Sequence, residues 1–210
     1  MFDGPTLVTF IAASLAVLLL PGPGVLYVIA RTAAQGYRAG FASVLGLSAG
    51  ALVHVLAAAL GLSALLLASA HGFALIKAAG AGYLVYLGLR LLVLRDGGGQ
   101  PAAQGALPLR RLFVDGIVVS LLNPKIALFF LAYLPQFVSP QSGAVSAQLL
   151  VLGLIYVGLA LLTDGAYALL AGGARSWLGG RLALGRWPRL ACGGLFIGLG
   201  LHAALGGRRG

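Results

Sequence analysis

Three ionisable side chains lie within long apolar runs of the sequence: Asp164 in "LLTDGAYALL", Lys125 in "LNPKIALFFLAYL" and His54 in "GALVHVLAA". Ionisable groups at membrane depth are costly, and they mark substrate or ion pathways by default. Asp164 could bind an ammonium group or accept a proton. Lys125 needs a negative partner, either Asp164 or a bound carboxylate. Histidine as a residue type titrates near physiological pH, so His54 could handle protons.

Each of these residues also has a purely structural interpretation. Asp164 could lie near the inner end of its helix and pair with a loop arginine such as Arg175. Lys125 could extend its side chain to reach the membrane surface. A single intramembrane histidine is more often a hydrogen-bonded packing group, which makes His54 the weakest candidate. We therefore favour a functional role for Asp164 and Lys125.

Two apolar runs are interrupted in a similar way, by "LPGPGVLYVIARTAAQ" from residue 20 and by "LNPKIALFFLAYLPQFV" from residue 122. A proline inside a helix removes a backbone hydrogen bond and costs about 3 kcal/mol or more, and hydrocarbon offers no replacement partner. Asn123 is suited to cap a new helix and Pro124 to occupy its first position. Pro23 after Gly22 could start a helix in the same way. We therefore predict a broken helix at each place.

A helix start presents free N–H groups and the positive end of the helix dipole, which together attract an anion such as a carboxylate. Two such starts near the middle of the membrane would hold a carboxylate-bearing solute. The alternative is a pair of ordinary proline kinks, but the matched pair with a lysine beside one break favours a site. The predicted binding residues are Pro21, Gly22, Pro23, Gly24, Asn123, Pro124, Lys125 and Asp164.

The composition indicates an integral membrane protein. Of the 210 residues, 60% are hydrophobic and 9% are charged, which is too few charges for the surface of a soluble domain. Several apolar runs exceed the roughly 20 residues that cross a bilayer as a helix, and their continuity disfavours a β-barrel. The net charge of +10 lies mainly in the gaps between these runs. This distribution indicates membrane topology and anionic headgroups rather than nucleic-acid binding.

We predict an all-α fold with six transmembrane helices in a single membrane domain. The helices cover about residues 5–30, 40–62, 72–94, 112–134, 147–170 and 189–205. Pro23 and Pro124 are 101 residues apart, as are Gln35 and Gln136. With three spans in each half, the second half enters the membrane from the opposite side. The pattern predicts two inverted repeats with broken helices 1 and 4, which is a common plan among secondary transporters. The repeats cover about residues 5–94 and 112–205, joined by a cytoplasmic linker at about 95–111.

The positions of the arginines predict the orientation. The first, third and fifth connections carry Arg31, Arg38, Arg95, Arg110, Arg111, Arg175, Arg181 and Arg186. The fourth connection has no charge. Because basic residues gather on the cytoplasmic side, we expect the odd-numbered connections inside and both chain termini outside. Arg208 and Arg209 disagree with this orientation, but they are outnumbered.

Three segments resemble the LysE/RhtB family of bacterial amino-acid exporters: "LPGPGVLYVIARTAAQGYRAGFASVLGLSAG", "IKAAGAGYLVYLGLRLL" and "LLNPKIALFFLAYLPQFV". The similarity extends from about residue 5 to 205, with the motifs in the order that the family has. The resemblance implies a six-helix protein of the bacterial inner membrane that exports amino acids or close analogues using the proton motive force. The family's motifs map onto Pro21, Gly22 and Pro23, and onto Asn123, Pro124 and Lys125.

The sequence departs from the family pattern in the second helix. Many relatives have Gly-Asp before a hydrophobic pair and a histidine, whereas this chain has Gly50, Ala51, Leu52, Val53 and His54. The missing carboxylate weakens the expectation of cation coupling and points away from basic substrates.

Other functions fit the sequence less well. The main alternative is an exporter of a metal cation or another small solute, but the histidines His54, His71 and His202 are dispersed. The chain has no glutamate, which excludes a zinc enzyme of the HExxH type. A scaffolding protein would have no use for paired helix breaks. We expect a transporter without cofactor or bound metal that works in the lipid bilayer with protons as coupling ions, and we leave a homo-oligomer open.

Overall fold

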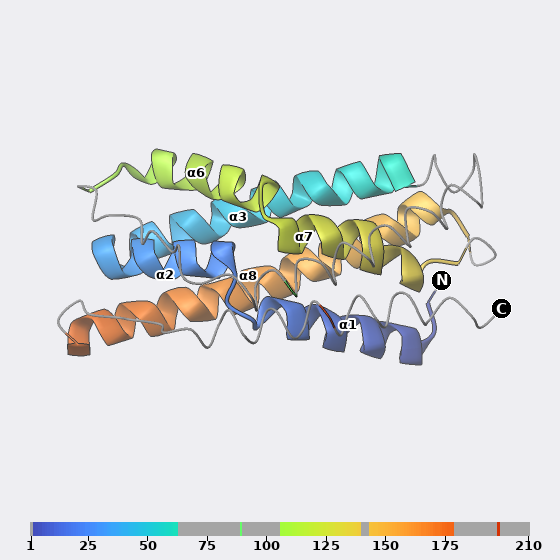
Figure 1. The fold of residues 1–210 in the computed structure, drawn as a ribbon, viewed down its shortest axis with the longest axis horizontal. Helices are drawn as coiled ribbons and strands as arrows, with labels where there is room; N and C mark the ends of the chain where they lie inside the picture. Colours follow the sequence, from blue (N-terminus) through green and yellow to red (C-terminus); the bar gives the residue numbers. More distant parts are fainter. Residues whose placement is uncertain (1, 63–88, 90–105, 140–142, 179–196, 198–210) are drawn as a thin grey trace.

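A computed structural model describes residues 2–62, 89, 106–139, 143–178 and 197 (Figure 1). The α-helices are α1 (Gly4–Leu18), α2 (Pro23–Gln35), α3 (Tyr37–Ala57), α6 (Leu109–Leu121), α7 (Pro124–Leu128) and α8 (Val145–Leu178). Short π-helical turns, η1 (Ala58–Leu62) and η2 (Phe129–Tyr133), extend α3 and α7, and the 3₁₀ turn η3 (Leu134–Phe137) follows η2. No strand occurs in the described part of the chain. The prediction of an all-helical fold is confirmed.

Two of the membrane spans are broken, as the prolines predict. The helices α1 and α2 meet at 53°, and α6 meets the helical segment Pro124–Phe137 at 46°. Two further spans are continuous: Tyr37–Gly61 with a mean hydropathy of 2.0, and Val145–Ala174 with a mean hydropathy of 2.3. The described residues therefore contain four apolar spans when each bent pair is counted as one.

Two helix ends differ by several residues from the approximate boundaries that the sequence predicts. Only Gly36 separates α2 from α3, whereas the sequence suggested a connection at about 31–39. The φ angle of Gly36 is 88°, which glycine adopts without strain, so a single residue reverses the chain. The helix α8 continues to Leu178 rather than ending near 170. Gly172 lies in this extension, and the ring of Tyr37 packs where a larger side chain would stand.

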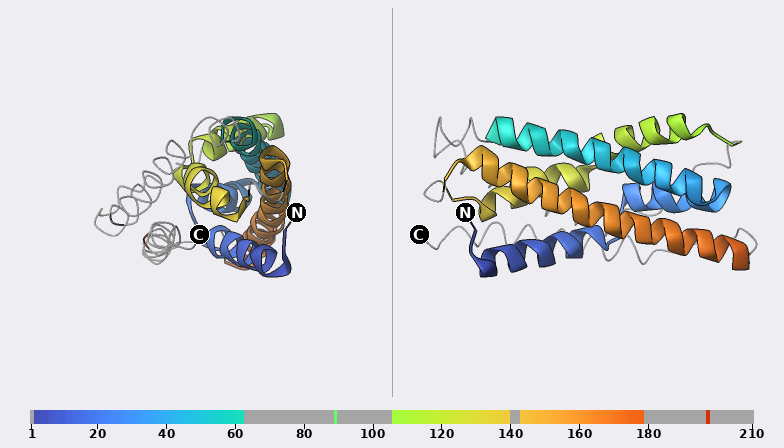
Figure 2. Two further views of the ribbon diagram at one scale, coloured as in Figure 1. Left: turned by 90° about the vertical axis from the view of Figure 1, so that its right-hand side faces the viewer. Right: turned by 180° about the vertical axis from the view of Figure 1, so that it is seen from behind.

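The two halves of the chain run in opposite directions. Figure 1 shows α1 and the segment Pro124–Phe137 at one end of the bundle, and α2 and α6 at the other end. Both breaks consequently fall near the middle of its length, and the view from behind agrees (Figure 2). The helices α3 and α8 are also antiparallel (Figure 1). These are the directions that an inverted repeat requires. The predicted spans 72–94 and 189–205 and most of the linker lie outside the described residues, so the six-span repeat stays a prediction.

The matched pairs of residues behave differently in the two halves. Pro23 and Pro124 each stand at the start of a helix. Gln35, in contrast, exchanges two hydrogen bonds with the backbone of Leu107, at 2.8 and 3.0 Å. Gln136 donates to the carbonyl of Ala132 in the preceding turn of its own helix, at 2.9 Å. The prolines therefore preserve a common local structure, whereas the glutamines do not.

Glycines bring α3 and α6 into close contact. A side chain at Gly46 would collide with the carbonyl oxygen of Phe113, and one at Gly116 would lie 2.8 Å from the carbonyl oxygen of Ser43. A side chain at Gly50 would lie 2.8 Å from the carbonyl oxygen of Ile117. Small residues let helix backbones approach in membranes, where dispersion rather than hydrophobic burial holds helices together. The spacing of Gly46 and Gly50, four residues apart, predicts such close helix packing, and these contacts confirm it.

Candidate functional site

The first break leaves the start of α2 without a side-chain cap. Gly22 precedes the helix in an extended conformation and has no side chain that could accept a hydrogen bond. The N–H groups of the first helical turn have no acceptor within the helix. Pro23 has no N–H, so the free donors of this turn begin at Gly24. The start of α2 therefore retains the positive end of its dipole and its free amide hydrogens.

The second break is capped by its own side chain. The backbone N–H of Lys125 donates to Oδ1 of Asn123 at 3.0 Å, and Pro124 occupies the first helical position. This arrangement confirms the predicted capping chemistry. It also distinguishes the two breaks, because Asn123 already uses a donor that a ligand would need. Pro23 and Pro124 themselves are exposed at the surface of the bundle, so each starts a helix without facing its interior.

Lys125 joins the two breaks. Its ammonium group donates to the carbonyl oxygens of Val17 at 3.1 Å and Leu20 at 2.8 Å, at the end of α1. The side chain is 5% exposed and passes close to Gly22, where a Cβ would lie 3.4 Å from Nζ. The last carbonyls of a helix carry the negative end of its dipole, which suits a cation. The structure thus gives Lys125 backbone partners that the sequence did not reveal.

Asp164 faces the same region from α8. It lies in the interior of that helix and is 7% exposed, so the alternative position near a helix end does not apply. Within the described part of the chain, no hydrogen bond is recorded to its carboxylate, while the positive charge of Lys125 acts on it. A buried carboxylate near a buried ammonium keeps the local charge balanced.

These residues surround one cavity of about 20 Å³, which has room for a water molecule. Twelve residues from five helices line it: Leu18, Gly24, Val25, Leu47, Ser48, Ala51, Asn123, Lys125, Ile126, Tyr156, Ala160 and Asp164. Four of the predicted binding residues, Gly24, Asn123, Lys125 and Asp164, are among them. Pro21, Gly22, Pro23 and Pro124 lie in the breaks beside the cavity and do not line it.

Two hydroxyl groups in the cavity wall were missed by the sequence analysis. Tyr156 on α8 is fully buried, and among the described residues neither its hydroxyl nor that of Ser48 on α3 has a hydrogen-bond partner. A buried polar group without a partner costs about 1–3 kcal/mol, so its presence needs an explanation. No signal in the sequence distinguishes Tyr156 from the other tyrosines, because its burial depends on the helices packed around it.

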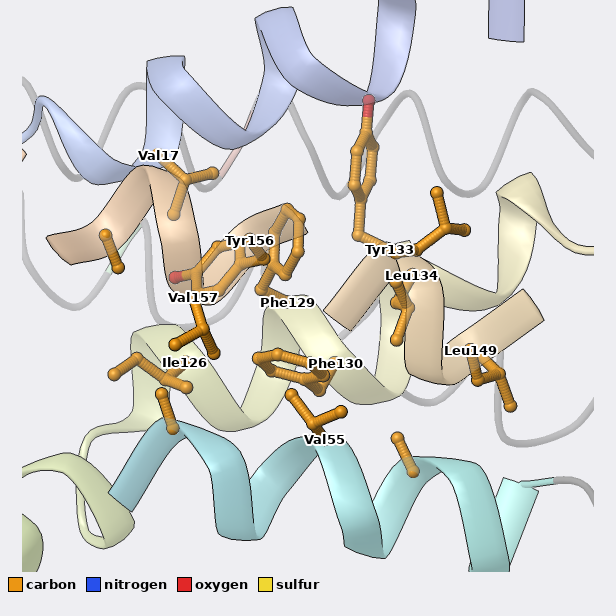
Figure 3. Close-up of a cluster of buried hydrophobic side chains, with 14 of the residues drawn as sticks. Val17, Val55, Ile126, Phe129, Phe130, Tyr133, Leu134, Leu149, Tyr156 and Val157 are labelled. Carbon is orange, nitrogen blue, oxygen red and sulfur yellow. The ribbon is translucent and has the colours of Figure 1, made fainter. Parts of the chain in front are cut away.

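The ring of Tyr156 belongs to an aromatic cluster that fills the neighbouring end of the bundle (Figure 3). It stacks on Phe129 with ring centroids 4.5 Å apart, and the edge contact with Phe130 is 5.2 Å. In Figure 3 the hydroxyl end of Tyr156 points away from Phe129, toward the side on which Val17 and Ile126 lie. The cluster therefore fixes the ring while leaving the hydroxyl at the cavity.

His54 lies elsewhere. It is half-buried, its Nε2 lies 3.2 Å from the carbonyl oxygen of Ser120, and its ring stacks against Phe130. It is not among the residues that line the cavity. This position matches the packing role that the sequence analysis gave as the alternative to proton handling.

The sequence predicts Arg31 in the first connection between spans. In the structure it lies instead in the last turns of α2. It is 9% exposed, and its guanidinium carbon lies 5.5 Å from the centre of the Tyr27 ring. Tyr27 in turn donates to the carbonyl oxygen of Leu112 at 2.8 Å, which ties α2 to α6. Arg31 therefore contributes to helix packing as well as to the basic charge at this end of the bundle.

Metal-binding side chains do not gather within the described residues, where no three His, Cys, Asp or Glu side chains come together. Of the three histidines, only His54 is described. The site is instead defined by a carboxylate, an ammonium group, two hydroxyls and an uncapped helix start around a cavity between broken helices. A membrane protein with these features has the organisation of a solute carrier.

Comparison with known proteins agrees with this class. Residues 15–207 match the family described as LysE type translocator, and the chain belongs to this family. A homoserine/homoserine lactone efflux protein of Salmonella typhimurium is 33% identical over 81% of this chain and 82% of its own length. An uncharacterized membrane protein of Pseudomonas aeruginosa is 31% identical over 93% of each chain. A leucine efflux protein of Salmonella typhimurium is 26% identical over 93% of each chain. No solved structure matches.

Proposed function

We propose that the protein is a secondary exporter of amino acids or close analogues in the bacterial inner membrane. Membership of the LysE type translocator family supports this function, as do relatives named for the efflux of homoserine and of leucine. The observation that carries the proposal is the cavity at mid-bundle, where Asp164 and the uncapped start of α2 face a common space. An amino acid has one charge of each sign to match these two groups.

The substrate carboxylate binds at the start of α2. Gly24 and Val25 line the cavity in the first turn of this helix, and no side chain caps their N–H groups. The helix dipole adds a partial positive charge there. The start of α7 contributes less, because Asn123 already accepts from the N–H of Lys125. The ammonium group of Lys125 adds positive charge nearby while it keeps its hydrogen bonds to the carbonyls at the end of α1.

The substrate ammonium binds Asp164 rather than the unwound carbonyls. Lys125 already donates to the carbonyls of Val17 and Leu20, and the hydroxyl of Tyr167 donates to the carbonyl of Leu19 at 2.5 Å. These contacts occupy the positions at which a second cation would approach the first break. Asp164 also serves as the coupling group, because it can exchange a proton when the substrate ammonium leaves. His54 is a weaker candidate for the coupling group, because it hydrogen-bonds the carbonyl of Ser120 and does not line the cavity.

Alternating access arises from movement of one three-helix repeat against the other around this fixed site. The repeats are residues about 5–94 and 112–205, with both termini outside the cell. The opposite directions of the two broken helices fit this plan (Figure 1). The cavity of about 20 Å³ is too small for an amino acid, so the described conformation corresponds to a contracted site that opens to load substrate.

The test is counterflow of labelled amino acids into proteoliposomes that contain the purified protein. Asp164→Asn removes a charge-assisted bond worth about 1.5–3 kcal/mol. We therefore expect a loss of roughly 10- to 150-fold in apparent substrate affinity. Asp115→Asn is the matched control, because Asp115 pairs with Arg111 at 2.9 Å and does not line the cavity. Normal exchange by Asp164→Asn would refute the assignment of this residue. Absence of exchange for every amino acid, together with flux of a divalent metal, would favour the alternative function, which is export of a metal cation.

A further inference from the structure

The hydroxyl of Tyr156 is a polar group in the cavity wall to which the proposed function gives no role. The side chain is fully buried, and its ring is held by Phe129 and Phe130, so the hydroxyl cannot turn to another environment. Nothing hydrogen-bonds to it among the described residues. A tyrosine hydroxyl is also too far from its own backbone to be satisfied there. The cavity that it lines has room for a water molecule, and a bound solute with a polar group would replace that water as the partner of the hydroxyl.

Ser48 presents a second hydroxyl to the same cavity from α3. Its Oγ is buried and has no hydrogen-bond partner in the part of the chain that the structure describes. Serine in a helix can turn back to the carbonyl four residues earlier, so this observation is weaker than that on Tyr156. Ser14 and Ser120 also have buried hydroxyls without partners within the described ranges, but neither residue lines the cavity. We therefore treat Ser48 as an auxiliary group and Tyr156 as the principal one.

Tyr156 and Asp164 lie on one stripe of α8. Residues 156, 160 and 164 are spaced by four and face the same side of the helix, and all three line the cavity. The residue between them is Ala160, whose small side chain leaves space along the stripe. A solute whose ammonium group meets Asp164 can therefore extend its side chain toward the Tyr156 hydroxyl.

We propose that Tyr156, assisted by Ser48, binds a hydroxyl group on a short substrate side chain, so that the preferred solutes are amino acids with hydroxylated side chains. This inference rests on the proposed function, because it assigns the α-carboxylate to α2 and the α-ammonium to Asp164. Apolar side chains of the wall, among them Leu18, Leu47 and Ile126, cover the methylene groups of the solute, and Asn123 and Lys125 also line the cavity. A site that hydrogen-bonds a substrate hydroxyl rejects the analogue without it, because buried polar groups are then left unpaired.

Two pairs of solutes of matched shape test the inference. Homoserine and norvaline differ by a hydroxyl in place of a methyl group, and so do serine and 2-aminobutyrate. The measurement is competition of each unlabelled solute against labelled homoserine in proteoliposome counterflow, and direct counterflow of labelled norvaline. We expect the wild-type protein to prefer the hydroxylated member of a pair by roughly tenfold or more. Tyr156→Phe should reduce this preference to within about twofold, mainly by weakening homoserine binding.

Tyr133→Phe is the matched control. Tyr133 is buried in the same aromatic cluster, with its ring 5.6 Å from that of Phe129, but it does not line the cavity. The Tyr133→Phe variant should retain the wild-type preference for the hydroxylated solute. The Ser48→Ala variant should lose part of this preference. Equal exchange of homoserine and norvaline by the wild-type protein would overturn the inference while leaving amino-acid export intact. An unchanged preference in Tyr156→Phe would also overturn it. Failure of the wild-type protein to exchange any amino acid would refute the proposed function itself.

Discussion

Replacing Lys125 with methionine tests whether its ammonium group holds the first break together. Methionine has a similar length and fits the apolar surroundings, but it cannot donate to the carbonyls of Val17 and Leu20. Each of the two hydrogen bonds from the charged donor contributes about 1.5–3 kcal/mol. Removing a buried ammonium relieves its desolvation, which offsets part of the loss. We therefore expect a net destabilisation of about 2–4 kcal/mol.

Thermal unfolding of the purified protein in detergent measures this effect. For a chain of this size, 1 kcal/mol shifts Tm by roughly 2–4 °C, so the expected decrease is about 4–16 °C. The control is Leu122→Ala, because Leu122 adjoins the second break and is 77% exposed. It should leave Tm within about 2 °C of the wild-type value. A Tm for Lys125→Met equal to that of the control would contradict the assigned role. In Lys125→Ala, which leaves space for a small amine, added ethylammonium should restore part of the lost stability.

Two further predictions concern the packing of α3 against α6 and the role of His54. Gly46→Ala should destabilise the protein by about 1–3 kcal/mol because the new methyl group collides with the carbonyl of Phe113. Gly158→Ala on α8 has open space and should not reduce Tm; equal Tm values for the two variants would refute the close contact. His54→Gln should retain most of the exchange activity, because His54 bonds Ser120 outside the cavity. Loss of proton-driven accumulation with folding preserved would instead assign His54 to coupling.

The sequence predicts the broken helices because their causes are local. Pro23 and Pro124 cannot donate a backbone hydrogen bond, and Asn123 carries a capping oxygen next to the donor that needs it. Gly46 and Gly50 likewise predict a close helix contact from their spacing alone. In each case the deciding interaction lies within a few residues or follows from the missing side chain itself.

The partners of Lys125 and the burial of Tyr156 could not be predicted in this way. Membrane helices are apolar on nearly every side, so the periodicity that marks the buried face of a soluble helix is weak here. Which face of α8 meets the cavity depends on helices that are distant in the sequence. Arg31 shows the same limit, because a basic residue near a helix end is expected in a connection but lies buried beside Tyr27.

The bond from Lys125 to the end of α1 has a consequence for biogenesis. The carbonyls of Val17 and Leu20 leave the ribosome 108 and 105 residues before the ammonium group that satisfies them. During that interval the carbonyl of Val17 accepts from the backbone N–H of Leu20 at 3.4 Å, and the carbonyl of Leu20 needs water, the translocon or a neighbouring chain as its partner. Native structure at the first break therefore forms late, only after the second break has been synthesised. Separately encoded halves should accordingly accumulate only when both are produced in the same cell.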